Sequence, residues 1–164
     1  MRIFGKTLSE YLRFQAPILV LIVVVGLARL ALSLAGVPNS AAKWLSVTVA
    51  VLIGTVYYAV RAHTTGFGSY KQLLPPLWIQ SVVANGIVIV GIVIGIVTGR
   101  DNIFTAPEYS GGGEGKTWFH VIAHVVVGVV VFPLITWALA SLIYFVTKKV
   151  APRPGAGPSP AATV

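Results

Sequence analysis

The sequence predicts an all-α, polytopic membrane protein with four transmembrane helices and both termini in the cytoplasm. Of its 164 residues 56% are hydrophobic and only 10% are charged, whereas a soluble domain carries about 25% charged residues. The apolar residues lie in runs of about 17 to 25, the length that crosses a hydrocarbon core about 30 Å thick. Basic residues are concentrated in alternate connecting segments, which is typical of a multi-pass protein.

Four apolar segments, with polar or glycine- and proline-containing breaks between them, define the expected organisation. A transmembrane domain over residues 1–150 is expected to hold spans at residues 14–35, 43–60, 75–97 and 118–145. Residues 151–164 are rich in Pro, Gly and Ala, so they cannot build a packed core and predict a disordered cytoplasmic tail.

Local signals refine these limits. The basic, amphipathic stretch before the first span fits either a short N-terminal interfacial helix or a simple positive flank, and Thr7 with Glu10 fits a capping box. Pro75 and Pro76 are expected to open the third span, where their missing N–H groups cost least. Pro133 predicts a kink in the fourth span because it removes one helical hydrogen bond.

The distribution of basic residues predicts the orientation. With the N-terminus inside, eight basic residues fall in cytoplasmic segments and three in outer segments, which satisfies the positive-inside rule. The inner set is Arg2, Lys6, Arg13, Arg61, Lys71, Lys148, Lys149 and Arg153, and the outer set is Lys43, Arg100 and Lys116. The expected location is a cell membrane, in particular a bacterial cytoplasmic (inner) membrane.

The third span carries small and polar residues on one face. At about 100° per residue they fall within an arc of roughly 140°, and they are Gln80, Ser81, Ala84, Asn85, Gly91, Gly95 and Gly99. Spacing of Gly91, Gly95 and Gly99 by four residues is typical of helix packing, within the chain or between copies. Asn85 is expected near mid-membrane, where its amide needs a protein, water or ligand partner. A second interpretation is a polar path formed by Arg29, Gln80, Ser81 and Asn85.

Arg29 is the only full charge expected inside a span. A charge near the bilayer centre costs about 2.5–3.5 kcal/mol on insertion scales. Three interpretations remain open at this stage. The side chain can extend towards the nearby headgroups, it can pair with Asp101 at the start of the outer loop, or it can take part in an anion or proton pathway.

His120 and His124 lie four residues apart, so both project from one face of the fourth span, with Gly128 continuing that face. The pair could hold a metal ion, with an oxygen ligand from the adjoining loop, or ligate a haem iron. His63 is expected about 30 Å away across the core and cannot share that iron. Interfacial side chains or a pH sensor are the alternatives, and no cofactor is predicted.

Several functional classes are disfavoured by the sequence. Gly115, Lys116 and Thr117 resemble the end of a phosphate-binding loop, but Ser110 replaces the required glycine and no strand precedes it, so no nucleotide is expected. The net charge of +8 is explained by retention of basic loops rather than by nucleic acid. The sequence has no cysteine and hence no thiol chemistry.

Three functional hypotheses remain. The first is a non-enzymatic subunit or scaffold that packs through the glycine face of the third span, as a homo-oligomer or against other membrane-protein subunits in the lipid bilayer. The second is a small oligomeric channel or transporter with a polar path near Ser81 and Asn85. The third is a metal- or haem-binding membrane protein that uses His120 and His124.

Overall fold

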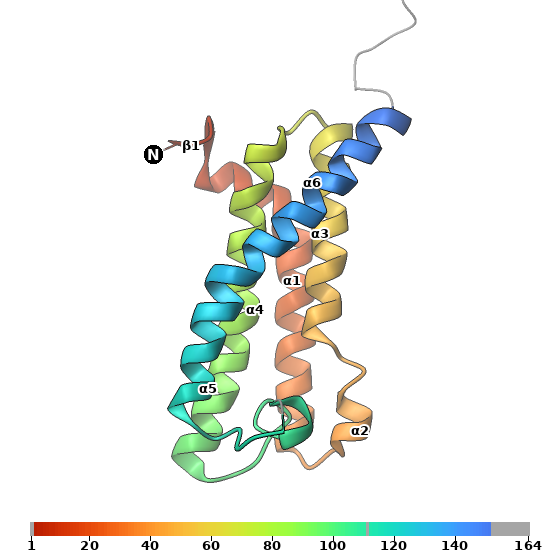
Figure 1. Ribbon diagram of the computed structural model, residues 1–164. Coiled ribbons are helices and arrows are strands. Elements are labelled where there is room, and N and C mark those ends of the chain that lie inside the picture. Colours follow the sequence, from red (N-terminus) through yellow and green to blue (C-terminus); the bar gives the residue numbers. More distant parts are fainter. Residues whose placement is uncertain (1, 111, 152–164) are drawn as a thin grey trace, which may run out of the picture.

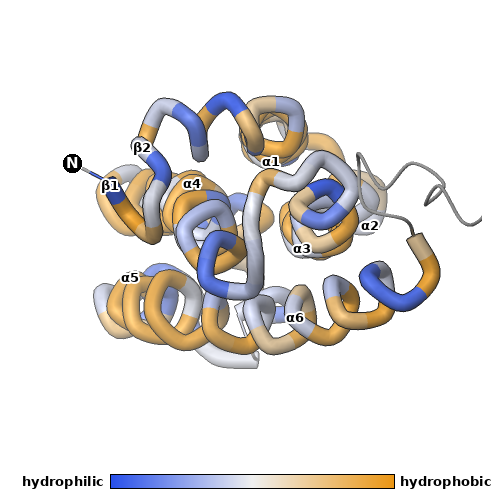
Figure 2. Tube along the Cα trace, turned by 90° about the horizontal axis from the view of Figure 1, so that it is seen from above, coloured by the Kyte–Doolittle hydropathy of each residue, from blue (hydrophilic) through white to orange (hydrophobic). Residues whose placement is uncertain are grey.

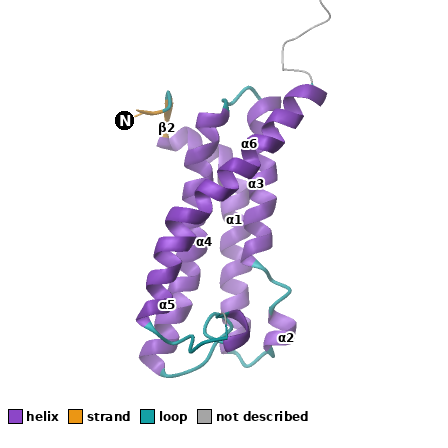
Figure 3. Ribbon diagram, in the orientation of Figure 1, coloured by secondary structure: helices purple, strands orange, loops and turns teal. Residues whose placement is uncertain are grey.

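The computed structural model describes residues 2–110 and 112–151 and shows an all-helical bundle (Figures 1 and 3). Four helical segments, spanning Leu8–Leu34, Asn39–Thr64, Tyr70–Thr98 and Trp118–Val150, are long and apolar enough to cross a membrane. The predicted all-α class with four long apolar helices is thereby confirmed. The tail predicted at residues 151–164 lies outside the described residues, except for Ala151.

A short hairpin precedes the first helix. Strands β1 (Arg2–Ile3) and β2 (Lys6–Thr7) pair antiparallel, and the turn between them places Phe4 and Gly5 at positive φ, as a two-residue hairpin turn requires. Helix α1 then runs without a break over Leu8–Leu34, and its first turn is held by the expected Thr7–Glu10 capping box. The end of the amphipathic stretch thus forms the first turns of α1 rather than a separate helix, and its place at a membrane interface stays a prediction.

The second hydrophobic segment is divided. A single turn, α2 (Asn39–Ala42), is followed by a loop, and α3 occupies Val47–Thr64. Ser46 caps α3 by accepting a hydrogen bond from the Val49 N–H at 3.3 Å. The helix therefore begins four residues later than the predicted span at Lys43. At 1.5 Å per residue α3 is about 27 Å long.

Helix α4 (Tyr70–Thr98) begins five residues before Pro75, so the prediction that the prolines open this helix is wrong. A capping box between Ser69 and Gln72 supplies the start signal, and both prolines lie beyond it within the helix. The helix ends at Gly99, whose φ of 70° is the left-handed conformation that glycine adopts at low cost.

The fourth long helix changes its winding. It comprises α5 (Trp118–Ala123), a π-helical segment at His124–Val131 and α6 (Phe132–Val150). The Phe132 N–H bonds to the Val127 carbonyl, five residues back. Pro133 has no N–H to donate, so it interrupts the α-helical ladder beside the wider turns. Pro133 thus lies two residues beyond a π-helical stretch that the sequence does not signal, and the kink itself stays a prediction.

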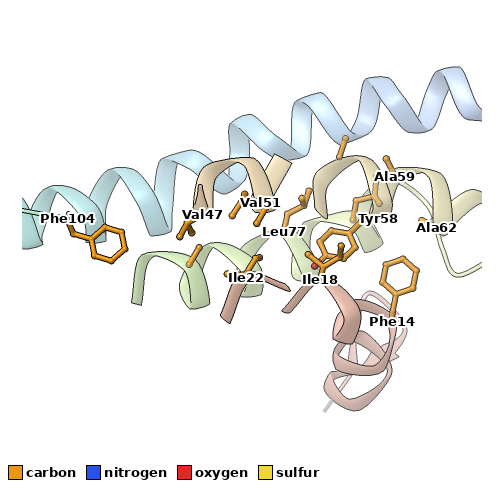
Figure 4. Close-up of a cluster of buried hydrophobic side chains, with 14 of the residues drawn as sticks. Phe14, Ile18, Ile22, Val47, Val51, Tyr58, Ala59, Ala62, Leu77 and Phe104 are labelled. Atoms are coloured by element: carbon orange, nitrogen blue, oxygen red, sulfur yellow. The ribbon is translucent and has the colours of Figure 1, made fainter. Parts of the chain in front are cut away.

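Helices α1 and α6 lie on opposite sides of the α3–α4 pair, as the view along the bundle shows (Figure 2). Their contacts bury a row of mostly apolar side chains that runs from Phe14 at one end to Phe104 at the other (Figure 4). Apolar side chains also cover much of the bundle's outer surface, including Val24, Ile53 and Ile135. Four helices with apolar residues on both faces are compatible with a membrane bundle.

The last helix diverges from α3 along its length. Helix α6 packs against both α3 and α4, whereas α5 and the π-helical segment pack mainly against α4. In Figure 1 the ribbon of the last helix crosses that of α3 in its α6 part, and the two helices separate towards α5 and α2. This divergence opens the bundle at the end that holds α2 and the segments at residues 99–110 and 112–117.

Candidate ligand pocket

A cavity of about 650 Å³ lies where α5 and the π-helical segment separate from α3. This volume is within the range typical of small-molecule sites. Its polar wall includes Arg29, Lys43, Asn85, Tyr109, His120 and His124, and its apolar wall includes Val47, Val51, Val88, Phe104, Val127 and Phe132. The described lining residues include two basic side chains and no carboxylate.

Arg29 enters the pocket from α1. Its guanidinium carbon lies 5.4 Å from the ring centre of Phe104 and 5.5 Å from that of Tyr109, distances at which a cation is attracted to an aromatic face. Its Nε is buried and has no hydrogen-bond partner in the described structure. The hypothesis of an Arg29–Asp101 pair is wrong, because Asp101 pairs with Lys116 at 3.0 Å. The guanidinium therefore keeps N–H donors for a ligand.

Asn85 and His124 join two helices at the pocket wall. The Asn85 amide nitrogen donates to the Ser81 carbonyl at 3.0 Å, and its oxygen lies 2.9 Å from Nδ1 of His124. Of the partners expected for the Asn85 amide, which were protein, water or a ligand, the structure thus supplies a protein side chain, His124. Gly128 permits this contact, because a Cβ added there would overlap the Asn85 amide.

His120 and His124 project from the same face, as their spacing predicts, and their ring centres are 5.0 Å apart. Nδ1 of His120 lies 2.9 Å from the Gly115 carbonyl oxygen. The described residues contain no group of three or more His, Cys, Asp or Glu side chains that could hold a metal. His63, as expected, lies at the other end of the bundle, beside Ala151.

Two members of the candidate polar path lie elsewhere. Gln80 is fully buried and donates to the Val51 carbonyl at 3.3 Å, while its amide oxygen fills the space beside Gly54. Ser81 is also fully buried and does not line the cavity. Only Arg29 and Asn85 of the four predicted residues therefore line it.

The glycine face of α4 is covered from within the chain. At Gly91 an added Cβ would lie 3.2 Å from Leu30 of α1 and would clash with the Phe104 ring. At Gly95 it would lie 2.7 Å from the Thr105 side chain. Gly99 caps the helix and has open space beside it. Gly91 and Gly95 thus provide close packing, mainly for the loop that follows the helix.

That loop is fastened by Asn102, which sequence reasoning missed. Its side-chain nitrogen donates to the Gly91 carbonyl at 2.8 Å, and its side-chain oxygen accepts from the Phe104 N–H at 3.0 Å. These bonds place Phe104 between α4 and Arg29. Comparison with protein-family models, curated proteins and solved structures gave no match, so the pocket's geometry and charge carry the functional argument.

Proposed function

We propose that the four helices cross a membrane with both termini in the cytoplasm, and that the chain is a non-enzymatic binding protein for an anionic amphiphile. The eight-to-three distribution of basic residues supports this orientation. It puts the N-terminal hairpin and the end of α6 inside. The pocket then lies in the outer half of the membrane, between α3 and the start of the last helix.

The charge of the lining selects the headgroup. Arg29 and Lys43 are basic side chains of the lining, and no described lining residue is acidic. The observation that carries the proposal is that Arg29 lines the cavity without an acidic partner among the described residues, since a donor left without an acceptor in an apolar site costs about 1–3 kcal/mol. A phosphate or carboxylate supplies that acceptor, and the planar guanidinium binds either group with paired hydrogen bonds.

The apolar wall selects the rest of the ligand. Val47 and Val51 of α3 face Val127 and Phe132 of the last helix across the cavity. Their separation leaves the cavity bounded by helices that diverge rather than close (Figure 1). A membrane lipid can enter such an opening sideways, with its chain against the valines and its headgroup at Arg29. The ligand class is therefore an anionic lipid.

A binding titration tests this proposal. The purified chain in a neutral detergent is titrated with dioctanoyl phosphatidylglycerol, dioctanoyl phosphatidylcholine and inorganic phosphate. The phosphatidylglycerol is expected to bind most tightly. Removing one charge-assisted hydrogen-bonding group costs about 1.5–3 kcal/mol, so Arg29→Met should weaken its binding by about tenfold to a hundredfold.

Arg13→Met is the matched control, because Arg13 is an exposed arginine on the same helix and does not line the pocket. Its affinity should equal that of the unmodified chain. Equal binding of both lipids, or equal losses in the two arginine variants, would refute the proposed site. Tight binding of phosphate alone would show that the site takes free anions rather than lipid.

The hypothesis of a subunit that packs through the glycine face of α4 is replaced by association through other surfaces. Because Gly91 and Gly95 already pack against Leu30, Phe104 and Thr105, another protein can reach this face only by displacing the loop. Association with copies of the chain or with other membrane proteins is therefore proposed through the exposed apolar surfaces of the helices instead.

A further inference from the structure

The two histidines of the pocket share one hydrogen-bonding arrangement. Nδ1 of His120 lies 2.9 Å from the Gly115 carbonyl oxygen. Nδ1 of His124 lies 2.9 Å from the Asn85 side-chain oxygen. Neither Nε2 has a hydrogen bond among the described residues, and both side chains are only partly buried and line the cavity. Both imidazoles thus leave the same nitrogen free.

The partners decide which nitrogen carries the proton. The Gly115 carbonyl can only accept, so Nδ1 of His120 is the donor. The Ser81 carbonyl can also only accept, so the Asn85 atom that faces it is the amide nitrogen. The Asn85 amide oxygen therefore faces His124, and Nδ1 of His124 is a donor as well. In neutral imidazoles each Nε2 then carries a lone pair.

This arrangement is the one found around metal-bound histidines, which usually donate their second ring N–H to a carbonyl or carboxylate. We propose that His120 and His124 chelate a divalent transition-metal ion, Zn²⁺ or a similar cation, through their two Nε2 atoms. Tetrahedral Zn–N bonds of about 2.0–2.1 Å put two such nitrogens about 3.3 Å apart. Rings on successive helical turns, with centres 5.0 Å apart, suit that separation.

The remaining coordination positions face the cavity. No third protein ligand is present among the described residues, so water or a bound anion completes the shell. Arg29 and Lys43 line the same cavity, and their charges lower the affinity for a cation until an anion is present. The histidine geometry carries this inference independently of the lipid-binding proposal.

Metal titration of the purified chain in detergent, without added lipid, tests the site. Co²⁺ is the spectroscopic probe, and Zn²⁺ affinity follows from competition. One equivalent of Co²⁺ should give visible absorption bands that Zn²⁺ abolishes. His120→Gln and His124→Gln should each weaken binding at least about tenfold, as loss of one of two ligands requires. His63→Gln is the matched control and should leave binding unchanged.

The hydrogen bond to Asn85 gives a second test. Asn85→Leu removes the acceptor for Nδ1 and should weaken metal binding by about tenfold, whereas Asn85→Asp keeps an acceptor and should restore it. Thermal unfolding of each variant shows that the bundle has folded. No Co²⁺ binding by the unmodified chain, or equal affinity in the folded His120, His124 and His63 variants, would overturn the metal site.

One further variant separates the two proposals. Arg29→Met should weaken selective lipid binding by about tenfold to a hundredfold while leaving metal affinity equal or higher, because a like charge has been removed from the pocket. Metal binding that survives in this variant, together with absent lipid selectivity in the unmodified chain, would leave the metal site standing and refute only the lipid site. Loss of metal binding in Arg29→Met would refute the claim that the metal site is independent of the lipid site.

Discussion

Gly128→Ala should disrupt the link between α4 and the last helix. The new Cβ would overlap the Asn85 amide, so this side chain must turn away from the space that it occupies. Turning breaks the hydrogen bonds from Asn85 to Ser81 and from His124 to Asn85, which are 3.0 and 2.9 Å long. The substitution changes the side chain by a single methyl group.

The magnitude follows from three contributions. Losing two hydrogen bonds costs about 0.5–1.5 kcal/mol each, and forcing a methyl group into a packed contact costs about 1–3 kcal/mol. Replacing glycine by alanine in a helix returns about 1 kcal/mol. The free energy of unfolding should therefore fall by about 1–5 kcal/mol. Metal affinity should also fall by about tenfold, because His124 loses its orienting partner.

Gly86→Ala provides the matched control. Gly86 is the neighbour of Asn85 on α4, and a Cβ there would meet nothing within 4 Å. Its substitution should raise stability by about 0.5–1 kcal/mol. Reversible unfolding in mixed detergent micelles, followed by circular dichroism, measures both variants. Equal stability of the two variants would refute the close contact between Gly128 and Asn85.

Two other regions give predictions. Gly95→Ala brings a Cβ within 2.7 Å of the Thr105 side chain, so it should lower stability by about 1–3 kcal/mol without changing oligomer size by light scattering; a smaller oligomer at unchanged stability would indicate an intermolecular glycine face. Because the sequence has no cysteine, single cysteines at Lys71, Lys148 and Lys116 can be labelled in intact cells by an impermeant maleimide. The outer position, Lys116, should react and the two inner positions should not; labelling of Lys71 alone would contradict the orientation.

The long apolar segments were predictable because hydrophobic length is a strong signal that needs no partner. Helix limits were harder, since capping decides them locally. The Thr7–Glu10 pair predicts the start of α1 correctly, whereas Pro75 and Pro76 predict a start of α4 that the Ser69–Gln72 capping box overrides. A cap formed by hydrogen-bonding side chains overrides the preference of proline for the first turn.

The pocket was only partly predictable. Helical spacing brings His120 and His124 together on one face, and the need to satisfy an amide in an apolar bundle predicts a partner for Asn85. That this partner is His124 depends on the relative depth of two helices, which one sequence does not specify. Phe104 and Tyr109 reach Arg29 from a loop whose path has no periodic signal.

The π-helical segment could not be foreseen either. Pro133 signalled a disturbance of the ladder, but whether a helix responds by bending or by widening depends on its neighbours. Here the wider turns lie where the last helix packs mainly against α4. The divergence from α3 at this point forms the cavity, so the feature on which the functional proposal rests arises from packing rather than from local sequence.

Native mass spectrometry of the chain released from cell membranes in mild detergent shows whether the pocket holds an anionic lipid. The unmodified chain should retain one anionic lipid under activation that strips zwitterionic lipid, and Arg29→Met should lose it while Arg13→Met keeps it. Equal retention of an anionic lipid by all three chains would place its binding outside the pocket and refute the lipid site.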